Sequence, residues 1–368
     1  MPIREESFRV GSGRYLQGKG YISRIGEEVC RLGSAPLVIG GKTALGLTCE
    51  QIEGSLKKKC NIYEIVTHTG TCNDEDAKVF ANLACEKGYD VIVGVGGGVI
   101  CDFAKLCAYY SKLPVINIPT SSATCAAYTP LSVRYTRDGR TTGTLHYEYE
   151  VDCVIADTEI IANQPIRLLL AGVFDSLAKF VEIKQRFTED TKEYPTGLDY
   201  AYVMSKYSFN FLNQNTQKCI DDMLSGNISD VVENVIFTAI AATGVISGIA
   251  RGSNQTAIAH KFYEMARFFY PKESGPYTHG EIVGVGLLAQ NHFNGEEENN
   301  RLLLDIMKRY NMPYCITDIG VEKTEAAFDQ IFQKVCTSSA INKEDEEECT
   351  KFKNALRYLW SLEKEKNL

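Results

Sequence analysis

A run of three glycines, Gly96 to Gly98, joins an apolar segment to a helix-like segment, and it constrains the fold more than any other feature. The preceding residues 91–95 are short, apolar and mostly β-branched, which is typical of a buried parallel strand. Residues 102–112 then carry apolar side chains at helical spacing. A strand, a glycine turn and a helix N-terminus present unpaired N–H groups and the positive end of the helix dipole, so this turn is a candidate anion site.

The segment that follows ends in hydroxyl side chains. Residues 114–120 form a second buried strand-like run, and it is followed by Ser121, Ser122 and Thr124. Polar groups at the carboxyl end of a parallel strand lie where open α/β sheets bind ligands. For the glycines alone, a tight turn without a ligand is the alternative, because Gly-x-Gly-Gly-Gly matches neither the dinucleotide fingerprint nor the P-loop.

Strand-like and helix-like segments alternate up to about residue 160, and helix-like segments alone follow. We therefore expect a doubly wound, mostly parallel, Rossmann-like α/β domain over residues 1–160 and an all-helical domain over residues 161–368. The expected strands are residues 7–14, 36–40, 61–66, 91–95, 114–120 and 153–156, with a polar hairpin-like segment at 137–144. The expected helices are residues 20–32, 51–59, 73–87, 102–112, 166–186, 200–212, 229–249, 281–293, 301–310, 324–335 and 350–362.

Composition excludes several classes of protein. A net charge of −8 argues against partners with a phosphate backbone and against an anionic membrane surface. No apolar segment is expected to approach the length of a membrane span, and the first residues do not resemble a signal peptide. The 13 cysteines include no C-x-x-C pair, which argues against a disulfide framework or a structural zinc knuckle. We expect a cytoplasmic protein.

Three side chains are candidates for a metal site. His260 follows small apolar residues on a helix-like segment, His279 precedes another helix, and Asp175 lies on an apolar helical face. A buried carboxylate is costly unless it is paired or metal-bound, and two imidazoles with one carboxylate suit zinc or ferrous iron. Spacing alone does not show that the three meet. The alternatives are hydrogen-bonded histidines and an ion pair between Asp175 and Lys179 or a distant arginine.

Taken together, several motifs are specific, and they cover nearly the whole chain. The chain resembles the iron-containing (group III) alcohol dehydrogenases, in the branch with glycerol dehydrogenase and hydroxycarboxylate dehydrogenase. The resemblance is sharpest at Gly96-Gly97-Gly98 with Asp102 and Lys105, at Pro119-Thr120, and at residues 131–135, 157–161, 171–175 and 279–281.

The resemblance implies a dehydroquinate synthase-like architecture, one divalent metal (zinc or iron) and NAD or NADP. It assigns the metal to Asp175, His260 and His279, which are also the expected catalytic residues. Residues 96–102 would lie under the cofactor phosphates. The full set expected at the cofactor is Gly41, Lys42, Gly96, Gly97, Gly98, Val99, Ile100, Cys101, Asp102, Thr120, Ser121, Ser122, Ala123, Thr129, Leu131 and Tyr135.

The chain departs from the glycerol dehydrogenase pattern at three places. Cys125 stands where those enzymes carry an aspartate at the substrate hydroxyl, so Cys125 is the expected substrate contact. Gly41 and Lys42 replace the carboxylate that selects NAD. A lysine without an acid would tolerate a 2′-phosphate, so NADP is expected beside NAD, and the alternative is a Lys42 that simply faces solvent. Residues 262–265 replace a His-Asn-Gly motif that the family often carries.

The expected function is hydride transfer between the nicotinamide and a small secondary alcohol or polyol, or its ketone. The alternatives are a 2-hydroxycarboxylate dehydrogenase that uses NADP(H), a dehydroquinate synthase-like NAD-dependent lyase, and a nucleotide-binding protein without catalysis. The expected partner is a small-molecule substrate, with neither nucleic acid nor membrane. A homo-oligomer is expected because members of the family commonly associate.

Overall fold

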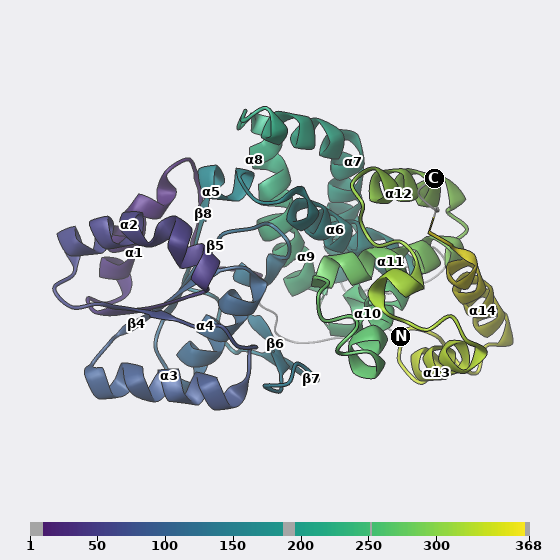
Figure 1. Ribbon diagram of the computed structural model, residues 1–368, viewed down its shortest axis with the longest axis horizontal. Helices are drawn as coiled ribbons and strands as arrows, with labels where there is room; N and C mark the ends of the chain where they lie inside the picture. The colour runs from purple at the N-terminus through teal and green to yellow at the C-terminus, as the bar shows by residue number, and fades with distance from the viewer. Residues whose placement is uncertain (1–9, 187–195, 251, 365–368) are drawn as a thin grey trace. The chain divides into compact units, whose positions relative to one another are not determined.

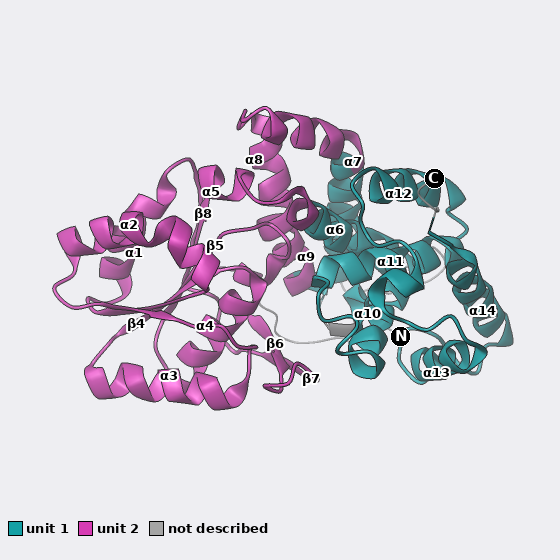
Figure 2. Ribbon diagram, viewed as in Figure 1, with its two compact units in different colours: residues 1–6, 170–212, 249–368 teal, residues 7–169, 213–248 magenta. Residues whose placement is uncertain are grey.

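The computed structural model describes residues 10–186, 196–250 and 252–364. Two compact units make up the chain, and each is described by itself (Figure 2). The sheet unit is formed by the described parts of Ser7–Leu169 and Asn213–Gly248. The helical unit is formed by the described parts of Leu170–Leu212 and Ile249–Leu368.

The sheet unit is built on a six-stranded sheet in which every pairing is parallel, in the order β1-β8-β5-β4-β2-β3. Its strands are β1 (Tyr15–Gly18), β2 (Pro36–Gly40), β3 (Glu64–Thr67), β4 (Val91–Gly96), β5 (Val115–Pro119) and β8 (Cys153–Asp157). The four central strands are buried along their whole length, as expected for a parallel sheet that is covered on both faces.

Helices cover both faces of this sheet (Figure 1). On one face lie α1 (Ile25–Leu32) and α2 (Lys42–Lys59). Their apolar side chains form a core with Val91, Val93 and Val95, the alternate residues of β4 that face this side. On the other face lie α3 (Asp74–Lys87) and α4 (Gly98–Ser111). The shorter elements of the unit are η1 (Tyr21–Arg24), η2 (Cys125–Ala127), α5 (Thr158–Ala162) and the antiparallel pair β6 (Leu131–Tyr135) and β7 (Thr141–His146).

Several boundaries correct the expectation from sequence. The first strand is β1, which pairs with β8, whereas residues 10–14 of the predicted strand 7–14 form none and residues 7–9 lie outside the described range. Helix α2 begins at Lys42 instead of residue 51, and α4 begins at Gly98 instead of residue 102. In both helices a glycine is the N-cap, so the turn after the strand leads directly into the helix.

The segment Asn213–Gly248 belongs to the sheet unit, so the compact units differ from the predicted division near residue 160, which stays a prediction. It holds the end of α7 (Thr196–Leu224), α8 (Asp230–Phe237), a π-helical turn η3 (Thr238–Ala242) and most of α9 (Thr243–Ala250). Polar contacts attach it to the sheet. Gln17 donates to the Glu233 carbonyl at 2.9 Å, and Thr158 donates to the Glu233 carboxylate at 3.1 Å.

One helical stretch, Asp230–Ala250, has the length and composition of a membrane span, with a hydropathy of 1.6. This corrects the expectation that no apolar segment approaches that length. Of the apolar window, 61% is buried inside the protein, and Val232, Val235 and Ile236 are fully covered. Burial within the protein accounts for the apolar composition of this stretch.

The helical unit contains α6 (Ile166–Arg186) from Leu170 onward, the first part of α7, α10 (Ile258–Phe269), α11 (His279–Phe293), α12 (Glu297–Arg309), α13 (Glu325–Cys336) and α14 (Glu346–Ser361), with the short turns η4 (Gly252–Gln255) and η5 (Ile316–Ile319). Its core includes the fully buried Phe174, Phe262, Phe328 and Phe352. Among the described residues beyond Asp157 no strand occurs. The predicted fold class, a parallel α/β sheet followed by a helical region, is confirmed.

Candidate metal centre and a polar cleft

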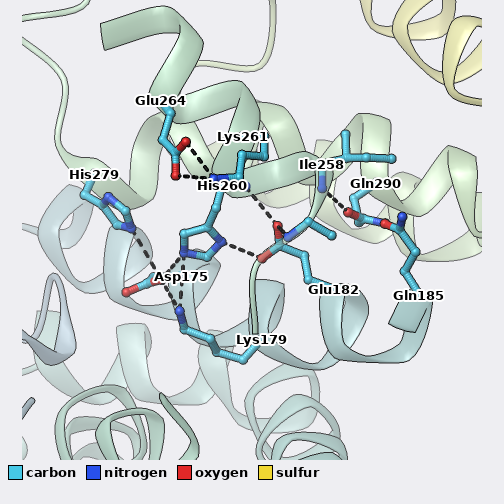
Figure 3. A network of polar contacts seen from close by, with 11 residues as sticks. Asp175, Lys179, Glu182, Gln185, Ile258, His260, Lys261, Glu264, His279 and Gln290 are labelled. Atoms are coloured by element: carbon cyan, nitrogen blue, oxygen red, sulfur yellow. Dashed lines mark hydrogen bonds and ion pairs between the residues drawn. The ribbon is translucent and has the colours of Figure 1, made fainter. Parts of the chain in front are cut away.

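Asp175, His260 and His279 come from three helices of the helical unit and meet at one point (Figure 3). Asp175 lies in the middle of α6, His260 in the first turn of α10, and His279 is the first residue of α11. Their ligand atoms all lie within 4.8 Å of one another. The structure therefore brings together the three residues that the sequence nominated separately.

Close packing of α11 against α6 places His279 beside Asp175. A Cβ atom at Gly280 would lie 1.9 Å from the carbonyl oxygen of Ala171, so glycine alone permits this approach. A capping box fixes the start of α11, because Thr278 accepts from the Glu281 N–H while the Glu281 carboxylate accepts from the Thr278 N–H. Packing and capping together orient the first residue of the helix.

The spacing of the ligand atoms fits a small cation. Asp175 Oδ1 lies 3.3 Å from His260 Nε2 and 3.6 Å from His279 Nε2. A tetrahedral ion with bonds of about 2.0 Å has ligands roughly 3.3 Å apart. Asp175 Oδ1 is buried and makes no hydrogen bond of ordinary geometry. His279 keeps 29% of its side chain exposed, so the site is not sealed on that side.

Two further side chains complete the site, and the sequence analysis did not assign either of them to it. The Lys179 ammonium lies 3.3 Å from His260 Nε2 and 3.7 Å from Asp175 Oδ1. Glu182 is fully buried and its carboxylate contacts His260 Nδ1. The signal that could have found them is the spacing of Asp175, Lys179 and Glu182, which places three polar residues on one face of an apolar helix.

Electrostatics keep both carboxyl groups of the site ionised. Burial opposes the charge on Asp175, but Lys179 and the imidazoles outweigh it and hold its pKa well below the usual range. Burial also opposes the charge on Glu182, but His260 outweighs it and lowers the pKa. At His260 burial disfavours the imidazolium, yet the Glu182 charge leaves the pKa raised, whereas at His279 burial dominates and lowers the pKa. Ionised carboxylates suit a site for a cation.

A cleft of about 760 Å³ lies in the sheet unit, at the carboxyl ends of β2, β3, β4, β5 and β8. The N-termini of α2 and α4 both border it, and neither has a side-chain cap. Two helix dipoles with free N–H groups therefore point at one cavity, together with Lys42. A Cβ atom at Gly96 would lie 2.9 Å from the Ile100 side chain, so the turn into α4 needs a glycine there. The cleft is suited to an elongated anionic ligand.

Some of the predicted cofactor residues line the cleft and others do not. Those that line the cleft are Gly41, Lys42, Gly96, Gly97, Ile100, Thr120 and Ser121. Those that do not line it are Gly98, Val99, Cys101, Asp102, Ser122, Ala123, Thr129, Leu131 and Tyr135, and the predicted substrate contact Cys125 is buried in η2. Residues that line it without having been predicted are Thr43, Ala44, Leu47, Gln51, His68, Thr69, Gly70, Asp157, Glu159, Ile160, Asn163, Gln164, Pro165 and Leu168. Most of these follow strand ends, which is the signal that could have found them.

Asp102 has a structural partner of its own. Its carboxylate lies 2.8 Å from Lys105 Nζ and accepts from the Val133 N–H at 3.0 Å. The Lys105 ammonium also donates to the carbonyls of Ala126 at 2.6 Å and Thr129 at 2.9 Å. This buried ion pair holds the segment after β5 in place, and that segment packs against Gly98 at the glycine turn.

The family model described as iron-containing alcohol dehydrogenase matches residues 12–158. The chain is also 30% identical, over 280 residues, to a glycerol dehydrogenase of Pseudomonas putida, which covers 76% of this chain and 75% of that protein. The chain belongs to the iron-containing alcohol dehydrogenase family and is an oxidoreductase of that family.

Further relatives show the range within the family. The chain is 30% identical to hydroxycarboxylate dehydrogenase A of Escherichia coli (strain K12) over 268 residues, 71% of this chain and 72% of that protein. The crystal structure of glycerol dehydrogenase from Schizosaccharomyces pombe has the same fold, with a TM-score of 0.80 at 20% identity over 98% of this chain and 91% of that chain. Family membership implies NAD(H) and a divalent metal, and Asp175, His260 and His279 form the candidate site for the metal.

Proposed function

We propose that this protein is a metal-dependent, NAD(P)-linked oxidoreductase that transfers hydride between the nicotinamide and a small secondary alcohol or polyol, or its ketone. The observation that carries the proposal is the environment of Asp175 Oδ1. This buried carboxylate oxygen lacks a hydrogen bond and lies 3.3 Å and 3.6 Å from two imidazole nitrogens. A buried charge without a close hydrogen bond is costly, and a divalent cation bound there would offset that cost.

Each part of the chain would have a defined role. Asp175, His260 and His279 would hold the cation, which when bound supplies Lewis-acid polarisation of the substrate oxygen for a hydride exchange carried by the nicotinamide. His279 lies on the exposed side of the site, where the substrate can enter. Glu182 lies behind His260, at Nδ1, whereas Lys179 lies beside Nε2, and both buried side chains would exclude water from the ring.

The cleft in the sheet unit supports binding of a dinucleotide. The N-termini of α2 and α4 can stabilise the pyrophosphate, and Lys42 borders the cleft after β2. The acids that line the cleft lie at the end of β8: Asp157 is its last residue and Glu159 follows it. The described lining residues between β2 and β3 include no acid. A lysine without an acid at that strand end favours a 2′-phosphate, so we propose NADP(H) as the preferred form. Lys42→Asp should shift the preference toward NADH, measured as the ratio of kcat/KM for the two cofactors.

The experiment for the metal uses purified full-length protein, stripped with a chelator and reloaded with zinc or ferrous ion. Rates are measured with glycerol and with 2-oxo acids, each with NAD(H) and NADP(H). Asp175→Asn and His260→Ala should lose both bound metal and turnover. His146→Ala is the matched control, because this exposed histidine lies at the end of β7, in the other unit. Full turnover in metal-free protein would refute the proposal.

A second candidate function, reduction of a 2-oxo acid, is favoured by Lys179. The two negative charges of Asp175 and Glu182 would balance the two positive charges of a divalent cation. The ammonium of Lys179 would then leave one net positive charge at the site. An excess positive charge at a buried site attracts an anionic substrate more than a neutral polyol. Initial rates with 2-oxobutyrate, 2-oxoglutarate and glycerol decide between the two. If Lys179→Met raises KM for the oxo acids alone, the substrate is a carboxylate.

A further inference from the structure

The polar face of α6 points at the first turn of α10 (Figure 3). Asp175, Lys179, Glu182 and Gln185 are three or four residues apart, so they lie along one side of the helix. Asp175 and Lys179 have been placed at the candidate metal site. Glu182 lies one turn further along α6. It contacts His260 at Nδ1, the ring nitrogen that faces away from Asp175 and His279.

Glu182 uses its two oxygens for two tasks. The N-cap residue of α10, Ala257, has no side chain that could cap the helix. Glu182 Oε1 accepts instead from the Ala257 N–H at 2.7 Å and from the His260 N–H at 2.9 Å. Glu182 Oε2 contacts His260 Nδ1. An ionised carboxylate accepts hydrogen bonds and cannot donate them, so the contact requires a proton on His260 Nδ1.

The opposite nitrogen of the same ring gives independent information. Lys179 Nζ lies 3.3 Å from His260 Nε2, and an ammonium group donates hydrogen bonds and cannot accept them. This contact therefore favours a lone pair on His260 Nε2. Asp175 Oδ1 lies at the same 3.3 Å from Nε2 and accepts hydrogen bonds, so it favours a proton there. The two contacts at Nε2 oppose each other, and the shorter contact of Glu182 decides the tautomer, with the proton on Nδ1 and the Nε2 lone pair available to a cation.

We propose that Glu182 is a positioning residue for the metal site, which holds His260 in the Nδ1–H tautomer so that Nε2 is available to a divalent cation. The inference rests on the metal role in the proposed function and adds the residue that prepares the ligand. Hydrogen bonds of this kind fix ring orientation at metal sites, and their loss costs about 10- to 100-fold in metal affinity.

The test is Glu182→Gln, which keeps the shape and removes the charge. The glutamine oxygen is needed by the N–H groups of Ala257 and His260, so its NH2 group faces Nδ1 and donates to it. The ring proton should then move to Nε2. The matched control is Glu264→Gln, because Glu264 lies on α10, the helix of His260, and pairs with Lys261 at 2.8 Å.

Two readouts follow. Ring-nitrogen NMR of metal-free, 15N-histidine-labelled protein at alkaline pH should report the Nδ1–H tautomer of His260 in the wild type and in the control, and the Nε2–H tautomer in Glu182→Gln. Competition with a chromophoric chelator should give a zinc Kd that is about 10- to 100-fold weaker for Glu182→Gln alone.

The outcomes separate this inference from the proposed function. An Nε2–H tautomer in the wild type overturns the inference even if the variant fails to fold, because that measurement needs no substitution. An unchanged tautomer and zinc affinity in folded Glu182→Gln overturns it as well, while the proposed function stands. A wild type that binds no divalent metal refutes the proposed function, whereas the NMR result still reports the tautomer.

Discussion

Gly280→Ala should separate the metal ligands without altering any of them. The new Cβ atom would lie 1.9 Å from the carbonyl oxygen of Ala171 and 2.5 Å from its carbonyl carbon. Both are backbone atoms, so no side-chain rotation relieves the clash. Real Cβ contacts begin at 3.0 Å, so α11 must move from α6 by about 1 Å. Asp175 lies one turn beyond Ala171, and His279 is adjacent to the substituted residue.

The displacement can be compared with the tolerance of a metal site. Ligand distances must hold within about 0.2 Å, and a misplacement of about 1 Å costs on the order of 100-fold in catalysis. We expect a zinc Kd at least about 10-fold weaker, measured by chelator competition, and a loss of about 1–3 kcal/mol in unfolding free energy of the metal-free protein, measured in urea.

A glycine in open surroundings provides the control for Gly280→Ala. Gly54 lies inside α2 with no atom within 4 Å of an added Cβ, so Gly54→Ala should stabilise the protein by about 0.5–1 kcal/mol and leave metal binding unchanged. If Gly280→Ala retains wild-type metal affinity and stability, the close approach of α11 to α6 does not position His279.

Three further predictions concern stability and metal content. Chelator treatment should abolish turnover and lower the thermal midpoint, because an ion at 100 times its Kd contributes about 2.7 kcal/mol, and calorimetry with and without added zinc measures this. The Asp90 carboxylate accepts from the N–H groups of Ser34 and Ala35; burial opposes its charge, but these bonds outweigh it and lower its pKa. The stabilisation that Asp90 contributes is present above its unfolded pKa of about 3.9 and is lost as pH falls through the lower folded pKa. Asp90→Asn should therefore lower the free energy of unfolding by about 1–2 kcal/mol at neutral pH. In a plot of this free energy against pH, the decrease at acid pH should be less steep for the variant. Lys105→Met should cost about 3–5 kcal/mol in urea unfolding, because it leaves the buried Asp102 carboxylate without its ion pair; a loss below 1 kcal/mol would contradict this role for the pair.

The parts of the fold that sequence predicted are those set by local patterns. Apolar β-branched runs identified β2, β4, β5 and β8, because strands covered on both faces leave a continuous apolar signature. The pattern failed at the start of α2, where residues 42–50 mix small, polar and apolar side chains. Helical periodicity also does not say which compact unit a helix packs against, so the grouping of Asn213–Gly248 with the sheet unit could not be read from the sequence.

The candidate metal site lay beyond local patterns. Asp175, His260 and His279 were nominated separately, and the resemblance, not their spacing, assigned them to one ion. Their meeting depends on the contact between Gly280 and Ala171, which has no sequence signature of its own. The cleft was predicted better, since the ends of neighbouring parallel strands lie at one edge of a sheet, although Asp102 and Cys125 proved to be buried away from it.

The alternative in which Asp175 is simply the partner of Lys179 can be judged against a second buried pair in the same chain. Asp102 and Lys105 approach to 2.8 Å, which is the length of a charge-assisted hydrogen bond. Asp175 and Lys179 remain 3.7 Å apart, although both are buried to a similar degree, and the lysine lies nearer to His260 Nε2 at 3.3 Å. A pair selected for its own stability would close to the shorter distance. The open arrangement instead leaves the carboxylate oxygen directed at two imidazoles, and a cation bound between them would further offset the cost of burying the carboxylate.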